Sequence, residues 1–252
     1  MEMVWAKKLM MNLRKSTGPD LVAEYACDKC RDTEIMVLDE GNAAVCQCMK
    51  KKRRERLFAS SKITPAFRSK TLDNFHTVGK TDVVREMHEC AKKYAENFPE
   101  IRYQEDNWIA FLGEPGCGKT HLSLAIANKL LGDGIPVLYF QHVEGVQEFL
   151  NSWDEHEIYS QKLEEMKKIP VLVWDDLFKP VGDTNKTEKK IAFEVLNYRY
   201  LNLLPTIISS ERSIKDLVLI DKAIGSRIAE RARKFTVTIT GLEHNFRLTK
   251  GA

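Results

Sequence analysis

The chain has 252 residues, of which 43% are hydrophobic, and it carries 39 Lys and Arg against 36 Asp and Glu. This length can bury one sizeable core or two modest ones without disulfide bonds, and the hydrophobic fraction excludes a disordered chain. No apolar run approaches the roughly 20 residues of a membrane span, and the first residues lack the apolar stretch of a signal peptide, so we expect a cytoplasmic protein with no membrane contact.

The charge is distributed unevenly along the chain. Residues 1–49 hold 6 basic and 8 acidic residues, whereas residues 50–70 hold 9 basic residues and one acidic residue. Residues 71–252 hold 24 basic and 27 acidic residues. The positive surplus therefore lies on one short segment, which we expect to contact nucleic acid, while the acidic first segment is the better candidate for protein contact.

Four of the six cysteines lie within 22 residues, namely Cys27, Cys30, Cys46 and Cys48. Clustered thiols in a reducing compartment are more often metal ligands than disulfides, and zinc binds four thiolates in a tetrahedron. Residues 34–38 and 43–45 predict a hairpin that brings the two cysteine pairs together. We expect a structural zinc site without an open coordination position; the alternative is four reduced thiols without metal.

A basic run occupies residues 50–58, with six Lys and Arg followed by Leu57 and Phe58. Three interpretations are equal at this point: a solvated helix face, a contact with phosphates, and a docking segment for an acidic partner. A linker with Thr64-Pro65 and the turn-prone residues 72–75 follows. We predict a domain boundary near residue 70, which gives a zinc-binding domain over residues 1–70 and a second domain over residues 71–252.

The strongest motif in the chain lies between a predicted strand, residues 108–112, and a predicted helix, residues 121–131. It has the form G-x4-G-K-T, the phosphate-binding loop of nucleotide-binding proteins. Lys119 is expected to bridge the β- and γ-phosphates, and Thr120 to offer its hydroxyl to magnesium. The helix N-terminus adds a favourable dipole. The predicted nucleotide-contacting residues are Gly113, Glu114, Pro115, Gly116, Cys117, Gly118, Lys119, Thr120 and His121.

A second motif follows the predicted strand 169–174, which ends in Asp175-Asp176. We expect Asp175 to hold magnesium through its water shell and Asp176 to orient and deprotonate the attacking water. Glu is usual at the second position in ATPases of this kind. The shorter Asp176 predicts slow hydrolysis, or an adaptor that uses ATP only to set its shape.

The remaining elements alternate. Strands are predicted over residues 136–140, 206–210 and 235–239, and helices over residues 142–152, 158–168 and 186–203, from residue 213 and from residue 221. This alternation predicts a mostly parallel sheet that is covered by helices on both faces.

Together these segments resemble the AAA+ helicase loaders of the DnaC/DnaI type. The resemblance rests on residues 113–120, 171–176, 208–211, 225–228 and 245–247; the cysteine cluster, the basic run and residues 63–68 and 71–75 resemble such loaders in Firmicutes and their phages. It implies an α/β fold, an AAA+ P-loop NTPase with a parallel five-stranded sheet, and ATP, magnesium and zinc as cofactors.

The same resemblance implies a function. The protein would be an ATPase of the primosome that binds the hexameric replicative helicase through residues 1–70, binds single-stranded DNA through its AAA+ domain, and loads the helicase during replication initiation. Self-assembly into an AAA+ oligomer is also implied. The helical segment 142–168 lies where related initiators carry an extra DNA-facing helix, but its mixed charges assign no DNA-binding residue.

The resemblance also implies roles for polar residues near the end of the chain. Ser210 falls in the sensor-1 region, where many AAA+ proteins have Asn, and Arg247 falls at the sensor-2 position. Arg227 and Arg231 fall in the arginine-finger segment. Physical reasoning alone leaves such arginines as surface charges or as groups that stabilise transition-state charge on a neighbour. Gly225-Ser226 favours Arg227, because these residues would present it on an exposed turn.

Two other functions compete. An IstB-like helper of transposition has almost the same ATPase core, but it binds duplex target DNA and a transposase; the zinc-type N-terminus favours the loader. A metabolic P-loop kinase is disfavoured, since no segment predicts a substrate lid and since the cysteine cluster and Arg227 would have no role.

Overall fold

The computed structural model describes residues 25–38, 42–152, 155–180 and 184–248. The chain divides into two compact units, Met1–Lys51 and Lys52–Ala252. Among the described residues, no helix combines the length and the apolar character needed to cross a membrane.

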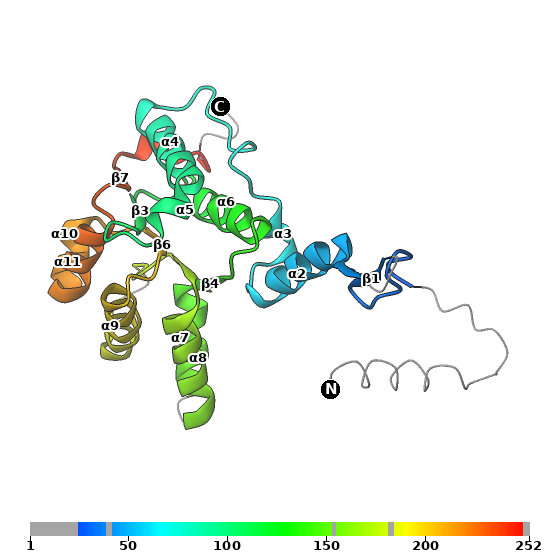
Figure 1. The fold of residues 1–252 in the computed structure, drawn as a ribbon. Helices are drawn as coiled ribbons and strands as arrows, with labels where there is room; N and C mark the ends of the chain where they lie inside the picture. The colour runs from blue at the N-terminus through cyan, green and yellow to red at the C-terminus, as the bar shows by residue number, and fades with distance from the viewer. Residues whose placement is uncertain (1–24, 39–41, 153–154, 181–183, 249–252) are drawn as a thin grey trace. The chain divides into compact units, whose positions relative to one another are not determined.

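The first unit contains a two-stranded antiparallel hairpin (Figure 1). Strand β1 (Ile35–Val37) pairs with β2 (Ala43–Val45), and Ile35 lies opposite Val45. The predicted hairpin is therefore confirmed, although residues 39–41 of its turn lie outside the described part of the chain. Helix α2 (Gln47–Ser60) follows directly and carries the basic run. Among its residues, none is buried.

The second unit is built on a five-stranded parallel sheet with the strand order β4-β5-β6-β3-β7. The strands are β3 (Ile109–Gly113), β4 (Val137–Gln141), β5 (Val171–Asp175), β6 (Thr206–Ser210) and β7 (Thr236–Ile239). Their apolar runs are buried on both faces, as a parallel sheet requires. Because the carboxyl ends of parallel strands meet at one edge, the loops after β3 and β5 open at the same edge of the sheet, with the end of β6 between them. The predicted sheet is confirmed.

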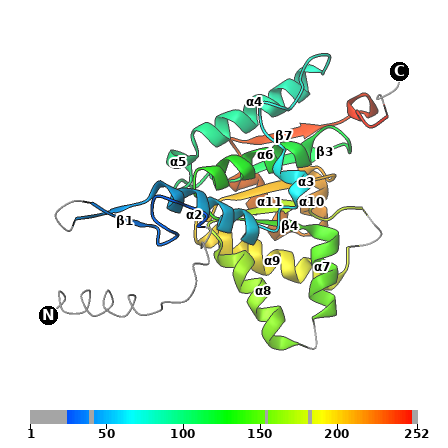
Figure 2. The same ribbon diagram turned by 90° about the vertical axis from the view of Figure 1, so that its right-hand side faces the viewer.

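Helices cover both faces of this sheet (Figure 2). The first face packs against α4 (Asp82–Glu96) and α6 (Lys119–Gly132), and the second against α7 (His142–Asn151), α8 (His156–Lys168), α9 (Lys186–Leu201), α10 (Ile214–Ile220) and α11 (Lys222–Arg231). Short helices lie at α3 (Pro65–Arg68), α5 (Phe98–Ile101) and η2 (Leu242–His244). Side chains alternate between the two cores along each strand, as Val173 and Trp174 of β5 do.

Helix α4 has no counterpart in the sequence prediction. Its buried residues Val84, Met87, Ala91 and Tyr94 recur at spacings of three and four, the pattern of one helix face. They pack into the core of the first sheet face. The helix therefore forms part of the support for the phosphate-binding loop.

The domain boundary predicted near residue 70 differs from the division in the structure, which falls between Lys51 and Lys52. Residues 61–75, which we call the strap, run along the second unit. Ile63 is buried in its core, and Phe67 packs against that core. The Tyr139 backbone N–H donates to the Ser61 carbonyl at 2.8 Å. These contacts hold the strap to the core of the second unit, which is why it is not a free linker.

A buried arginine fixes β5 relative to β6. Arg199 of α9 donates through its guanidinium to the carbonyls of Ile169 and Pro205, which immediately precede these strands, and through Nε to the Thr206 hydroxyl at 2.9 Å. Burial lowers the pKa of Arg199 to about 9, so the side chain stays charged at neutral pH. The clamp sets the register of the two strands that carry Asp175 and Ser209.

Candidate functional site

The phosphate-binding loop depends on glycine. Gly113, Gly116 and Gly118 have φ angles of 99°, 77° and 102°, which other residues rarely adopt. A Cβ on Gly113 would lie 1.8 Å from the carbonyl oxygen of Ile239 in β7. The loop therefore passes tightly over the sheet edge and starts α6 at Lys119.

Lys119 lies at the floor of a cavity of about 220 Å³ beside this loop. Its side chain is buried, and Nζ donates to the carbonyls of Gly113 at 2.7 Å and of Glu114 at 2.6 Å. An ammonium group held only by neutral carbonyls is a strong attractor for an anion. The cavity is lined by Phe67, Lys70, Pro115, Gly116, Gly118, Lys119, Thr120, His121, Leu124, Asp176, Glu211 and Arg247.

Three hydroxyl groups converge on the buried carboxylate of Asp175. Thr120 Oγ1 donates to Oδ1 at 3.0 Å, and Ser209 Oγ donates to the same oxygen. Tyr139 Oη donates to Oδ2 at 2.8 Å. Burial raises the pKa of Asp175, while these hydrogen bonds oppose that rise. The arrangement joins the loop after β3 to the ends of β4, β5 and β6.

Asp176 lies beside this group and lines the cavity. Its φ of 53° turns the chain sharply after β5, and its N–H donates to Ser209 Oγ at 2.9 Å. Its Oδ2 accepts from Lys179 Nζ at 2.7 Å, and Lys179 also lies 3.9 Å from Glu211. A carboxylate at the cavity wall can accept a proton, but in this arrangement it is paired with a cation.

These groups fit a magnesium nucleotide. Oxygen ligands from a threonine hydroxyl and a carboxylate suit Mg²⁺, and a lysine with loop N–H groups suits phosphate oxygens. Thr120 and Asp175 are already in contact, although they are 55 residues apart in the chain. The fit rests on this convergence of donors, which the strand order imposes.

A second cavity of about 310 Å³ lies along the other side of the phosphate-binding loop. Phe75 and Phe246 contribute its aromatic lining, with Lys80 Nζ 3.1 Å from the centre of the Phe246 ring. Phe75 approaches the loop closely, since its Cε2 lies 2.5 Å from the place of a Cβ on Gly118. Flat aromatic walls of this kind suit a planar base.

Two residues of the loop motif point elsewhere. Cys117 is buried, and its Sγ donates to the Glu114 carbonyl at 3.1 Å. The His121 ring reaches the strap, with Nε2 3.0 Å from both the Thr71 carbonyl and Asn74 Oδ1. Burial lowers the pKa of His121, which favours the neutral ring. His121 therefore binds the strap to α6 and does not add a cation for phosphate.

The sensor-1 prediction needs a correction. Ser210 Oγ donates to the Leu177 carbonyl at 2.6 Å, on the side of β6 that faces the second core. Its neighbour Ser209 is the residue that contacts both Asp175 and Asp176. Successive side chains of a strand point to opposite faces, so only one of the two serines can reach the site. The alternation of side chains along the strand was the signal in the sequence that separates Ser209 from Ser210, and the sequence prediction did not use it.

The arginine predictions have mixed outcomes. Arg247 is exposed and lines the first cavity. Arg231 is buried and donates to the carbonyls of Glu105 and Tyr200, both at 2.9 Å, so its guanidinium is held inside the fold.

Arg227 does not lie on an exposed turn, because it belongs to helix α11. Its Nη1 donates to the Ala223 carbonyl at 2.9 Å. Gly225 allows α11 to approach α10, since a Cβ there would lie 2.5 Å from Val218 N.

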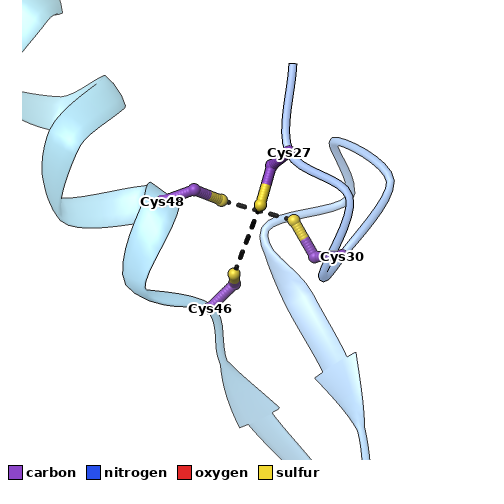
Figure 3. Close-up of side chains that lie close together, drawn as sticks. All are labelled: Cys27, Cys30, Cys46 and Cys48. Atoms are coloured by element: carbon purple, nitrogen blue, oxygen red, sulfur yellow. Dashed lines mark hydrogen bonds between the residues drawn. The ribbon is translucent and has the colours of Figure 1, made fainter. Parts of the chain in front are cut away.

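The four clustered cysteines meet in the first unit (Figure 3). Their sulfur atoms all lie within 4.8 Å of one another, with 3.8 Å between Cys27 and Cys46 and 3.3 Å between Cys30 and Cys48. A zinc–sulfur bond of about 2.3 Å in a tetrahedron separates sulfurs by about 3.8 Å. The backbone N–H of Cys30 lowers the pKa of Cys27 to about 7, whereas the hydrogen bond with the Cys30 thiol raises the pKa of Cys48. The donor set fits a structural zinc ion.

Comparisons with known proteins agree with this geometry. Residues 50–248 match the family described as IstB-like ATP binding protein. The chain is 39% identical over 235 residues to the phage-like element PBSX protein XkdC of Bacillus subtilis (strain 168), covering 90% of this chain and 87% of that protein. It is 26% identical over 189 residues to the replicative helicase loader DnaC of Escherichia coli (strain K12), covering 72% and 70%. The crystal structure of the DnaC helicase loader shares the fold, with a TM-score of 0.59 and 23% identity over 70% of this chain and 99% of that one. The crystal structure of DnaI shares it too, with a TM-score of 0.57 and 23% identity over 71% of this chain and 94% of that one.

Proposed function

The chain belongs to the IstB-like family of AAA+ ATP-binding proteins, and we propose that it is an ATP-dependent loader that binds the hexameric replicative helicase and delivers it onto single-stranded DNA. The observation that carries the proposal is a cavity lined by Lys119 and Thr120, with Asp175 hydrogen-bonded to Thr120, in a chain that also has a four-cysteine unit. The cavity supports control by ATP, and the four-cysteine unit supports a separate surface for a partner.

We assign a separate role in ATP binding or hydrolysis to each polar residue in or beside the cavity. Bound magnesium would neutralise charge on the β- and γ-phosphates. Lys119 would hold the phosphates, with Thr120 and Asp175 oriented toward the metal. Asp176 would take a proton from the attacking water, and the exposed Arg247 at the cavity wall would meet phosphate charge. The pairing of Asp176 with Lys179 supports the slow hydrolysis predicted from the short aspartate.

The second cavity is the proposed place of the adenine base. It shares Gly116, Gly118 and His121 with the first cavity, so a nucleotide can pass from one to the other around the loop. Phe75 and Phe246 would contact the base. The strap and the end of the chain thus both contribute to one nucleotide.

The first unit presents an apolar surface that supports partner contact. Ile35, Val37 and Val45 are 54%, 73% and 64% exposed. Ile35 and Val45 are paired across the hairpin, and Val37 is two residues beyond Ile35, so all three share one face. Exposed apolar patches of this kind mark protein interfaces. We assign this hairpin face to the helicase.

The match to the IstB-like family keeps in competition the second function weighed from the sequence, help in transposition on duplex DNA. The type of DNA bound distinguishes the two. A loader prefers single-stranded DNA, and a transposition helper prefers a duplex of the same length. Fluorescence anisotropy with both substrates in the presence of ATP decides between them.

Single-stranded DNA is expected to bind through helix α2. We predict that replacing Lys50, Lys51, Arg53 and Arg54 with Gln lowers the salt dependence of binding, because each lost phosphate contact removes about 0.7 from the slope of log K against log salt, or about 3 for all four. Anisotropy over a salt series measures this slope. The control replaces Lys186, Lys215 and Lys222, exposed on other helices, with Gln. An unchanged slope in the α2 variant, or a preference for duplex DNA, would contradict the assignment.

A further inference from the structure

Tyr139 of β4 joins the strap to the carboxylate that the proposed function gives to magnesium. Its hydroxyl donates to Asp175 Oδ2, its backbone N–H donates to the Ser61 carbonyl, and its ring lies edge-on to Phe67, with ring centres 6.1 Å apart. The side chain is almost fully buried. No sequence motif points to this residue.

In the hydrogen bond between Tyr139 and Asp175, the tyrosine hydroxyl is the donor and the carboxylate is the acceptor. This direction follows because a phenol hydroxyl carries a proton and a carboxylate oxygen only accepts. Asp175 Oδ2 therefore has a fixed donor, while Oδ1 is shared by Thr120 and Ser209. With the Thr120 oxygen engaged by magnesium, Ser209 and Tyr139 would still donate to Asp175 and orient its carboxylate.

We infer that Tyr139 is a positioning residue that orients Asp175 for magnesium and couples the strap to the nucleotide. The inference rests on the proposed nucleotide–magnesium site. A donor that fixes a carboxylate ligand typically changes metal affinity by 10- to 100-fold when it is lost. Because the same residue contacts Ser61 and Phe67, movement of Asp175 and movement of the strap are linked through one side chain.

The strap itself reaches the cavity. Phe67 and Lys70 line it, and the Asn128 side-chain amide of α6 donates to the carbonyls of both residues, at 3.0 and 2.8 Å. The strap begins directly after α2, which ends at Ser60. A nucleotide with magnesium thus acts on the segment that follows the basic helix, through Tyr139 and through the cavity lining.

The test replaces Tyr139 with Phe, which keeps the ring and removes only the hydroxyl. We expect the apparent affinity for Mg²⁺, measured with a fluorescent ATP analogue on the full chain, to fall 10- to 100-fold, while binding of the analogue in EDTA stays unchanged. The matched control is Tyr94→Phe, which removes another buried hydroxyl, one that donates to the Asn107 carbonyl at 2.7 Å. This control should lower stability without changing Mg²⁺ affinity.

Hydrogen exchange supplies a second measurement. Magnesium with the ATP analogue should slow exchange of the Tyr139 amide in the wild type and slow it less in Tyr139→Phe. Equal Mg²⁺ affinity in the wild type and Tyr139→Phe would overturn the inference, and so would an equal fall in Tyr94→Phe. A wild-type chain whose nucleotide binding ignores Mg²⁺ would instead overturn the proposed site, and the inference with it.

Discussion

Replacing Cys46 with Ser is expected to release zinc and to unfold the first unit. Among the described residues of that unit, the buried side chains are those of Cys30 and Cys46, so the thiol cluster is its core. Structural zinc contributes about 10–16 kcal/mol of folding free energy in small domains, far more than the exposed hairpin can supply. Metal analysis should find about one zinc per chain in the wild type and none in the variant.

Cys90→Ser is the matched control, since Cys90 lies outside the cluster on α4. It should retain zinc and leave the amide spectrum of residues 25–51 unchanged. The second unit has its own cores on the two faces of its sheet, so Cys46→Ser should still bind ATP. A wild-type chain whose first unit folds without metal would refute the zinc assignment.

Replacing Lys119 with Ala is expected to remove ATP binding. The buried ammonium is the only cation that the described structure places against the loop carbonyls of Gly113 and Glu114, and the phosphates would lose their buried counter-charge. Breaking a buried charge pair costs about 3–5 kcal/mol, which corresponds to a loss of affinity on the order of 10²- to 10³-fold. Isothermal titration with ATP and magnesium measures the change.

Lys129→Ala controls for loss of a lysine from the same helix, because Lys129 is exposed and pairs with Asp133. Its ATP affinity should match that of the wild type. Nucleotide binding by Lys119→Ala within a factor of about three of the wild type would show that phosphate binds elsewhere.

Local patterns were enough to predict which residues come together at the candidate nucleotide site. The loop from Gly113 to Thr120 and the strand that ends at Asp175 are each encoded in one continuous segment. Strand alternation then places their ends together, because parallel strands open at one edge. The contact between Thr120 and Asp175 follows from these two motifs and the fold.

Residues whose roles depend on packing could not be read in the same way. Arg231 has the pattern of a surface arginine, but it is buried because the carbonyls of Glu105 and Tyr200 accept its donors. Gly225 suggested a turn, whereas its role is to allow two helices to approach. Tyr139 belongs to a strand with no motif, and only the strand order β4-β5 brings it to Asp175.

The segment before the domain boundary that was predicted near residue 70 was also misjudged from its sequence. Thr64-Pro65 and the turn-prone residues 72–75 are typical of a linker, and they do interrupt regular structure. The apolar residues next to Thr64-Pro65, Ile63 and Phe67, nevertheless pack in or against the core of the second unit. Turn chemistry predicts where a helix ends, but it does not predict whether the following segment is covered by the core.

Complex formation with the replicative helicase of the organism that encodes this chain tests the proposed function most directly. The full chain with zinc, ATP and magnesium is mixed with the helicase, and the mass of the complex is measured by light scattering after size exclusion. We predict a stable complex that Val37→Lys weakens at least tenfold, while Val78→Lys, at a valine of the second unit that is 94% exposed, leaves it intact. No complex with the wild type, or equal binding by the two variants, would contradict the account.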